Sequence, residues 1–298
     1  MTGTTRHAEA ATGTRRSVVR IGPRTAAALV LVSSAGLAMF LWPLLIVPPE
    51  DAAPGLGAPV VFVLVMPVIL AIVMSEVGSG ELDTKAIAML GVLTAIGAAL
   101  RPLGAGVAGI ETVFFLLVLA GRVYGPGFGF VLGTTTMFAS AILTGGLGPW
   151  LPFQMLASGW VGLGAGLLPR RVHGRAELAM LAAYGAASAF AFGFVLNMWF
   201  WPYSIGADTQ LSYVAGGPVV ENLQRFFLYT VATSTLGWDL GRAITNVAAI
   251  VVLGPTILAV LHRAARRAAF DATVAFEPAP AASTPPTDAP GDAYDQRP

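Results

Sequence analysis

The residues with the clearest chemical potential are Asp239, Arg242 and Asn246, which stand three and four positions apart near the start of an apolar segment. On a helix this spacing places a carboxylate, a guanidinium and an amide on one face. Together they can hold a polar ligand by ion pairing and hydrogen bonding. A structural alternative stays open, in which Asp239 caps a helix N-terminus and Arg242 extends its side chain to the membrane surface.

Other polar residues lie inside or beside apolar segments. Arg101 and Glu111 flank one short loop. Gln154 follows a glycine- and proline-rich turn, and Asn197 lies near the end of a long apolar run. Because an unpaired polar side chain is costly in a membrane, each is a candidate ligand contact. Arg101 and Glu111 have a structural alternative, which is an ion pair between two helices.

Aromatic side chains gather at the same predicted end of the apolar segments. They are Trp150, Phe153, Trp199, Trp201, Tyr203, Tyr213 and Trp238. Tryptophan and tyrosine ordinarily mark the headgroup region of a bilayer. Of the six tryptophans, however, only Trp160 lies well away from this end, whereas a headgroup belt should populate both interfaces. Stacking on a flat, partly apolar ligand is therefore the second interpretation, with Trp150, Phe153, Trp201 and Trp238 as candidate contacts.

The elements that must position these residues are transmembrane helices. Hydrophobic residues make up 55% of the 298-residue chain and charged residues 11%. Between Glu111 and Pro169, Arg122 is the one charge in three successive apolar segments, which a lipid solvent accepts and a soluble domain cannot bury. The predicted spans are residues 25–47, 58–75, 86–104, 108–123, 128–144, 153–169, 176–200 and 239–262. The fold class is therefore an all-α integral membrane protein, a polytopic helical bundle.

Basic residues predict the orientation of the bundle. With eight spans, the arginines before the first span, after the sixth and after the eighth fall on one face. By the positive-inside rule both termini are cytoplasmic and the protein is a multi-pass protein of the plasma membrane. Residues 48–57, 102–107, 145–152 and 201–238 then face outside. The last of these loops is long enough to cover a site, and residues 219–237 contain an amphipathic stretch suited to a short interfacial helix.

Four regions follow from this pattern. Residues 1–23 form a basic cytoplasmic segment, 24–80 two extra helices, 81–265 a six-helix core and 266–298 a disordered, proline-rich tail. The pair Arg15-Arg16 before an apolar run is loosely similar to a twin-arginine export signal, but the run is long and lacks a clean small-residue cleavage site, which favours a retained helix.

Composition also limits the chemistry and the partners. The formal net charge of +1 gives no reason to expect nucleic acid. The chain has no cysteine, and His7, His173 and His262 lie far apart, so we expect neither a metal site nor thiol catalysis. No cofactor and no catalytic residue are expected.

Small residues recur every four positions in two predicted spans. Gly91, Ala95 and Ala99 share one face of the segment 86–104, and Gly162 and Gly166 repeat the spacing in the segment 153–169. This spacing lets helix backbones approach closely in lipid. Packing inside the bundle and docking of a separate membrane partner are both open.

Four sequence blocks follow one another along the chain: the Ala95/Ala99 pair, ETVFFLLVLAGRVYGPGFG at 111–129, GGLGPWLPFQ at 145–154 and DLGRAITN at 239–246. In these blocks and their order, the segment from Ala86 to Leu261 resembles the substrate-specific S component of energy-coupling factor (ECF) vitamin transporters. The two helices before the six-helix core depart from the family pattern and leave room for an added partner contact or a different arrangement.

The resemblance implies a protein that binds a vitamin-class small molecule on the outer face. It also implies docking on a membrane coupling subunit through Ala95 and Ala99, with Gly91 extending that surface, and two cytosolic ATPase subunits that drive release. The sequence contains no phosphate-binding loop of its own, as expected for a dependent subunit. The roomy 201–238 segment and the outer aromatic residues favour a large, cobalamin-type ligand over riboflavin or a pyrimidine or queuosine precursor.

Two other classes remain as alternatives. A self-sufficient ion-coupled transporter would have an inverted repeat and a carboxylate near mid-membrane, neither of which is visible in the sequence. An integral membrane enzyme would cluster acidic or histidine residues at one membrane face, and this chain shows no such cluster.

Overall fold

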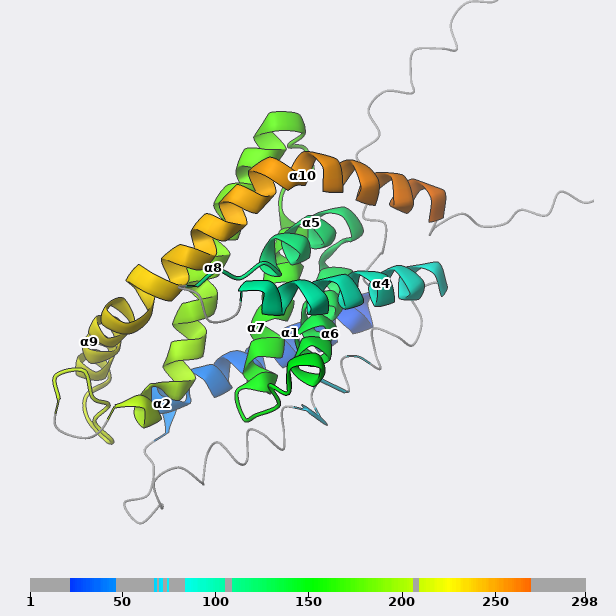
Figure 1. Cartoon of the computed structure of the whole chain (residues 1–298). Helices are drawn as coiled ribbons and strands as arrows, with labels where there is room; N and C mark the ends of the chain where they lie inside the picture. The colour runs from blue at the N-terminus through cyan, green and yellow to red at the C-terminus, as the bar shows by residue number, and fades with distance from the viewer. Residues whose placement is uncertain are drawn as a thin grey trace, which may run out of the picture.

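The computed structural model describes residues 22–46, 67–68, 70–71, 74, 84–104, 109–205 and 209–268. Regular structure within these residues is helical (Figure 1). The elements are α1 (Pro23–Phe40), α2 (Trp42–Leu45), α4 (Thr84–Leu100), η1 (Arg101–Gly104), α5 (Phe114–Tyr124), α6 (Pro126–Thr144), α7 (Leu151–Leu167), α8 (Gly174–Ser204), α9 (Val219–Thr230), the π-helix η2 (Val231–Asp239) and α10 (Leu240–Ala268). Five helices are long and apolar enough to cross a membrane, which confirms the all-α polytopic fold.

Proline and glycine set many of the helix boundaries, so several predicted spans agree with the structure to within a few residues. Pro126 occupies the first turn of α6 and Pro152 the first turn of α7, where a missing N–H costs nothing. Gly125 separates α5 from α6 with φ of 111°, a conformation that glycine alone adopts without strain. The predicted span 58–75 lies largely outside the described residues, as do the basic segment 1–23 and the tail 266–298.

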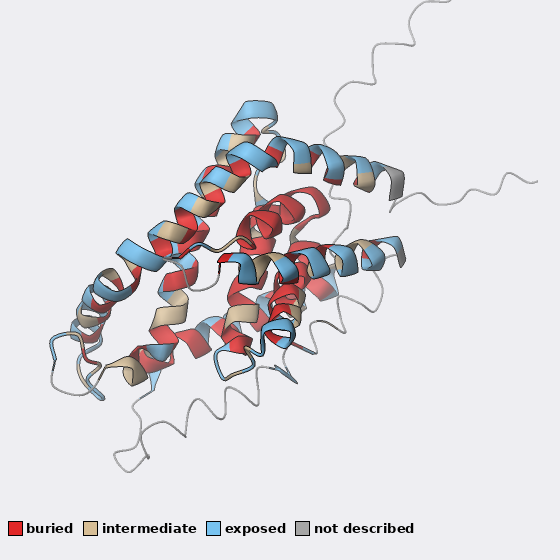
Figure 2. Cartoon of the chain, in the orientation of Figure 1, coloured by how far each residue is buried: buried red, intermediate tan, exposed pale blue. Residues whose placement is uncertain are grey.

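The predicted span at 108–123 is too long. The helix α5 has 11 residues and reaches about 16 Å, well short of a bilayer crossing. Every residue of α5 is buried, and the helix packs against α6, α7, α8 and α10 (Figure 2). Residues 109–113 reach α5 as non-helical chain, and Thr112 Oγ1 donates a hydrogen bond to the Leu100 carbonyl. A continuous apolar run therefore marks an internal helix here, not a lipid-facing one.

Glycines bring α5, α6 and α7 together. A Cβ on Gly121 or Gly129 would collide with the backbone oxygen of Gly162, and one on Gly166 would collide with the backbone of Pro126. The small-residue spacing in the predicted sixth span thus serves internal packing, which decides between the two interpretations of Gly162 and Gly166. The small residues of α4 lie in a different environment, described below.

The long helices α8 and α10 run side by side along one edge of the bundle (Figure 1). With 31 residues, α8 extends for about 46 Å, more than the roughly 30 Å hydrocarbon core of a bilayer. We call the end of the bundle at which α4 and α8 finish and α7 begins the outer end, after the orientation predicted from the sequence. The inner end is the opposite one, where α7 finishes and α8 begins.

The predicted outer segment 201–238 is mostly helical. Residues 219–230 form α9, which confirms the amphipathic helix, but α9 continues through η2 into α10 without a break. The resulting helical stretch, Val219–Arg266, has 48 residues. The described residues between α8 and α9 are therefore the only non-helical part of this segment, and the start of the last predicted span at 239 lies in mid-helix.

Candidate functional site

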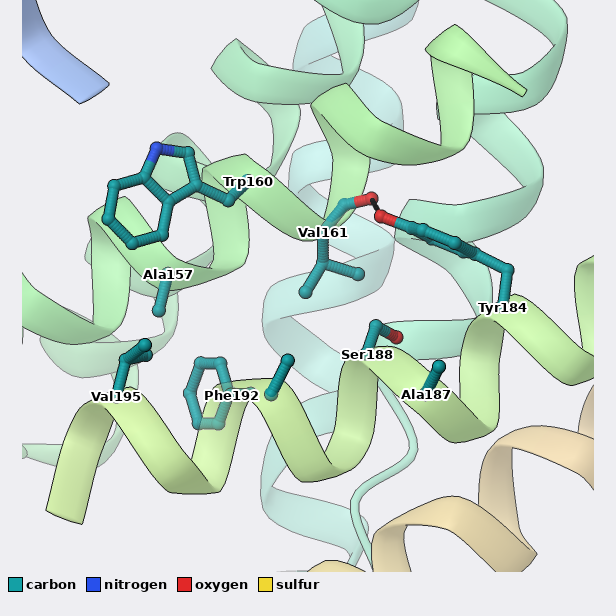
Figure 3. Close-up of a pocket in the computed structure, with 9 residues that line it drawn as sticks. Ala157, Trp160, Val161, Tyr184, Ala187, Ser188, Phe192 and Val195 are labelled. Atoms are coloured by element: carbon teal, nitrogen blue, oxygen red, sulfur yellow. Dashed lines mark hydrogen bonds between the residues drawn. The ribbon is translucent and has the colours of Figure 1, made fainter. Parts of the chain in front are cut away.

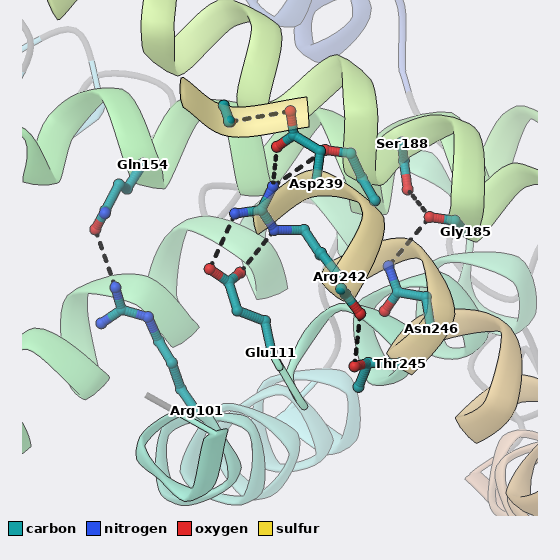
Figure 4. A network of polar contacts seen from close by, with 12 residues as sticks. Arg101, Glu111, Gln154, Gly185, Ser188, Asp239, Arg242, Thr245 and Asn246 are labelled. Carbon is teal, nitrogen blue, oxygen red and sulfur yellow. Dashed lines mark hydrogen bonds and ion pairs between the residues drawn. The ribbon is translucent and has the colours of Figure 1, made fainter. Parts of the chain in front are cut away.

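The guanidinium of Arg242 is the centre of a buried polar network at the outer end (Figure 4). Its Nε and Nη2 donate to the two carboxylate oxygens of Glu111, each at 3.0 Å. Its Nη1 donates to Asp239 Oδ1 at 3.0 Å and to the Ala189 carbonyl at 3.1 Å. The paired, charge-assisted geometry with Glu111 is the strongest that arginine makes with a carboxylate. It joins the chain just before α5 to α10, across 131 positions.

Aromatic rings and one glycine shape the space around this network. The Arg242 guanidinium lies 4.8 Å from the Phe192 ring centroid and 5.6 Å from that of Phe114, within cation–π range. A Cβ on Gly193 would collide with the Asp239 carboxylate, so α8 can approach Asp239 only because this residue is glycine. Ser234 Oγ donates to Asp239 Oδ2 at 3.0 Å and completes the environment of that carboxylate.

The structural alternative for Asp239 and Arg242 is wrong. Asp239 ends the π-helix inside a continuous helical stretch, so it does not cap a helix N-terminus. Asp239 is 1% exposed and Arg242 5%, so neither side chain extends to the membrane surface. The i, i+3 spacing correctly predicted that the two side chains meet. Two carboxylates and one guanidinium are thereby concentrated between α5, α8 and α10.

Asn246 lies one turn further along α10 and faces α8. Its Nδ2 donates to the Gly185 carbonyl at 3.1 Å, an oxygen that also accepts a 3.0 Å bond from Ser188 Oγ. Its Oδ1 is fully buried and has no hydrogen-bond partner among the described residues. The same holds for Asn197 Nδ2 on α8 and for Thr230 Oγ1 at the end of α9. Unpartnered buried polar atoms are rare in native proteins and indicate a partner such as water or a ligand.

Arg101 and Gln154 form a separate pair beside this network (Figure 4). Arg101 Nη2 donates to Gln154 Oε1 at 3.1 Å and thereby links η1 to α7. Since Glu111 is ion-paired with Arg242, the expectation of an ion pair between Arg101 and Glu111 is wrong. The error arose because flanking one loop suggested a local pair, whereas α10 brings a stronger partner from the far end of the chain.

The aromatic candidates divide into two groups. Phe153 and Trp201 are 0% exposed. Phe153 stacks on Trp199 with ring centroids 4.3 Å apart, and Trp201 donates its indole N–H to the Leu211 carbonyl at 2.7 Å. Trp150 and Trp238 are each 45% exposed. The half-exposed pair is open to a ligand in this conformation, whereas a role for the buried pair stays a prediction that needs movement of their neighbours.

Several residues of the site were not identified from the sequence. Ser234 donates to Asp239 across five positions, the spacing that a π-helix provides. Phe114 and Phe192 are indistinguishable by pattern from other core aromatics. The role of Gly193 could not be recognised in the sequence either, because it depends on Asp239 of η2 lying against it in the fold. What pointed to this region in the sequence was the set of polar residues in and beside apolar segments, namely Glu111, Asp239, Arg242 and Asn246.

The structure also contains an apolar pocket of about 250 Å³ between α7 and α8 (Figure 3). Its lining includes Trp160 and Val161 from α7 and Tyr184, Ser188 and Phe192 from α8. Phe192 separates the pocket from the Arg242 network, since the same ring contacts the guanidinium.

A different surface is formed by the small residues of α4. Gly91, Ala95 and Ala99 are exposed, and no atom lies within 4 Å of a Cβ built on Gly91. Ile87, Val92 and Ile96 are also exposed, at 52%, 57% and 46%. The other face of α4 packs on α6, where Gly97 approaches Thr136. The exposed residues therefore form an apolar, small-residue face without a partner among the described residues.

In the part of the chain that the structure describes, no group of three or more His, Asp or Glu side chains is arranged to hold a metal ion. The Glu111 and Asp239 carboxylates are instead occupied by Arg242.

Together these features define a polytopic helical membrane protein with a buried polar site at one end and an apolar helix face that no other described residue covers. A family model described as "ECF transporter, substrate-specific component" matches residues 85–254, more than half of the chain. The chain therefore belongs to the substrate-specific components of ECF transporters. Among curated proteins and among solved structures, no match is found.

Proposed function

We propose that this S component binds a vitamin-class small molecule at its outer end and delivers it through an ECF importer. The observation that carries the proposal is the Arg242 network, together with the buried Oδ1 of Asn246 one turn further along α10, which lacks a partner among the described residues. Buried charges and unsatisfied polar atoms cost stability, so a protein that retains them uses them. Ligand groups that donate and accept hydrogen bonds would satisfy these atoms.

The proposed ligand is large and partly apolar, with a cobalamin-type compound preferred over riboflavin or a pyrimidine or queuosine precursor. Trp150 and Trp238 would supply exposed stacking surfaces at the outer end. Tyr213, in the connection to α9, packs on Trp201, and burial raises the pKa of its phenol. Trp201 would become accessible if its contacts with Leu211 and Tyr213 opened.

Delivery in this proposal depends on partners. The exposed face of α4, with Gly91, Ala95 and Ala99, docks on a membrane coupling subunit because small residues let two helices approach closely. Two cytosolic ATPase subunits then supply the energy. Membership of the family favours this importer role over a self-sufficient ion-coupled transporter or an enzyme.

The first test is chemical. Protein purified in detergent from cells grown in rich medium is analysed by mass spectrometry for a co-purifying small molecule. The emptied protein is then titrated with cyanocobalamin, riboflavin, thiamine and a queuosine precursor in calorimetry. A stoichiometric compound of the vitamin class, or binding of one panel member, supports the proposal. An empty protein that binds no panel member contradicts it.

A further inference from the structure

The helices α1 and α2 lie outside the region that matches the family, yet they pack on its core. α1 contacts α7 and α8, and α2 contacts α8 and α9. Along α1, Trp160 Nε1 donates to Ser33 Oγ at 2.9 Å, and the Phe40 ring lies 5.2 Å from Phe153. Gly36 lets the Leu156 side chain approach the backbone of α1. These two helices are thus integrated into the bundle.

The contacts of α2 are concentrated on the outer end of α8. Trp42 is 3% exposed and donates its indole N–H to the Trp199 carbonyl at 3.1 Å. Its ring stacks on Tyr203 at 5.8 Å with 26° between the planes. Leu41 and Leu44 pack on a small hydrophobic cluster that contains Met198. Trp42 therefore holds α8 on both sides of Pro202 in sequence.

Pro202 weakens the last turn of α8, the turn to which α2 is attached. Proline has no N–H to donate to the carbonyl four residues earlier, so the last turn of α8 has weaker internal support than a regular helix end. The indole hydrogen bond and ring stacking from α2 act on residues of that same turn. The two contacts from α2 therefore hold this turn from outside, with the indole N–H on the Trp199 carbonyl and not on the Met198 carbonyl that Pro202 leaves without a helical donor.

The last turn of α8 is in turn connected to the candidate site. Trp201 is in contact with Phe226 and Tyr229 of α9, with ring centroids 5.4 and 6.5 Å apart. Asn222 then ties α9 back to Val214 through two hydrogen bonds of 2.8 and 3.0 Å. Because α9 continues through η2 to Asp239, the position of the α8 end affects the geometry around Arg242.

We propose that α1 and α2 form a brace for the outer end of α8 and for α9, and that Trp42 is its positioning residue. Trp42 acts through Trp199 and Tyr203 and does not touch the ligand. Loss of its contacts loosens the outer end of α8 and α9 while the inner half of the bundle stays closed. The consequence for ligand retention rests on the proposed function, but the positioning role does not.

The test uses the absence of native cysteine. Met198→Cys places a reporter at a position that is 1% exposed in the cluster under Leu41 and Leu44, and Leu181→Cys places one at a 0% exposed core position toward the inner end. Maleimide labelling is measured in the full-length protein in detergent, with Trp42, Trp42→Phe and Trp42→Ala backgrounds. We expect Trp42→Ala to raise labelling of Met198→Cys about tenfold through local opening, with Leu181→Cys unchanged. Trp42→Phe, which keeps a stacking ring but loses the N–H, should be intermediate.

Two results overturn the brace. Equal labelling of Met198→Cys in all three backgrounds means that Trp42 does not support the α8 end. A rise at both reporters means that Trp42 stabilises the whole bundle and has no positioning role. If Met198→Cys itself perturbs folding, hydrogen–deuterium exchange of residues 196–204 and 219–230 in the cysteine-free backgrounds decides the same question. Phe138→Ala, which removes a half-exposed aromatic ring of α6 away from both the brace and the candidate site, is the control. Failure of every compound in the ligand panel would contradict the proposed function and leave this outcome intact.

Discussion

Arg242 shows how one residue can organise a site in a membrane. Its guanidinium has five N–H donors, and the structure gives it four hydrogen bonds, three of them to carboxylate oxygens. A charge that is 5% exposed is tolerable only when it is compensated in this way. Removal of Arg242 therefore leaves the buried Asp239 carboxylate without its ion-pair partner.

We accordingly expect Arg242→Ala to destabilise the protein by about 3–5 kcal/mol, the usual cost of breaking a buried ion pair. The same substitution should abolish binding of any panel compound that the wild-type protein binds. Thermal unfolding in detergent and calorimetry measure the two effects. Arg263→Ala, at an exposed inner position of α10, is the matched control and should change neither. Wild-type behaviour of Arg242→Ala would show that the network is not essential to fold or site.

Asn246 separates binding from stability more cleanly. Its Oδ1 has no partner in the described part of the chain, whereas the Gly185 carbonyl that its Nδ2 contacts keeps a second donor in Ser188. We expect Asn246→Ala to weaken ligand binding by about tenfold or more, equivalent to about 1.4 kcal/mol or more. The unfolding temperature should fall only modestly. Calorimetry of both proteins with the same compound provides the measurement, and unchanged affinity would assign the Oδ1 atom to internal water.

At the scale of elements, short sequence patterns predicted helix starts and helix amphipathicity, which depend on neighbouring residues alone. Proline and glycine marked the starts of α6 and α7. The amphipathic pattern marked α9. The length of α5 was wrong because an apolar run does not say whether lipid or protein surrounds it. The Glu111–Arg242 pair was not predictable, since it depends on α10 crossing α5 and not on sequence distance.

The glycine contacts between α6 and α7 give a test of packing. A methyl group on Gly162 meets the backbone of Gly129, which cannot move aside as a flexible side chain would. We expect Gly162→Ala to destabilise the protein by about 1–3 kcal/mol, as overpacking usually does. Gly91→Ala is the control, because nothing lies within 4 Å of the methyl group that this substitution adds and alanine favours helix. In thermal unfolding, the unfolding temperature of Gly162→Ala should therefore fall, while that of Gly91→Ala should not.

The exposed face of α4 gives a test of docking. Ala95→Trp places a bulky ring on the surface that we propose meets the coupling subunit, far from the Arg242 network. Uptake of the identified ligand by cells should be lost, while binding to the purified protein stays unchanged. Val252→Trp introduces the same ring on α10, at a residue that is 71% exposed, and should leave both uptake and binding intact. Loss of binding in Ala95→Trp would mean that α4 belongs to the ligand site.

At the scale of the whole molecule, the distribution of charge distinguishes the two ends. The inner end carries exposed Arg171, Arg175, Arg263 and Arg266. Near the outer end, Arg242 is buried against carboxylates, Arg101 is bonded to Gln154, and the partly exposed Arg225 donates to the Thr209 carbonyl. Inner arginines that are exposed to headgroups and water favour a cytoplasmic location for that end. An importer subunit needs this polarity, because its ligand arrives outside and its energy source is inside.

Single-cysteine labelling tests this orientation in the otherwise cysteine-free chain. Ala215→Cys lies exposed in the α8–α9 connection, and Ala176→Cys lies exposed in the first turn of α8 at the inner end. In intact cells a membrane-impermeant maleimide should label Ala215→Cys at once and Ala176→Cys only after permeabilisation, because the bilayer blocks the reagent. The reverse pattern would place the Arg242 network on the cytoplasmic side. A site there could not capture a nutrient from outside, so this single result would remove the physical basis for uptake even if the purified protein bound a vitamin.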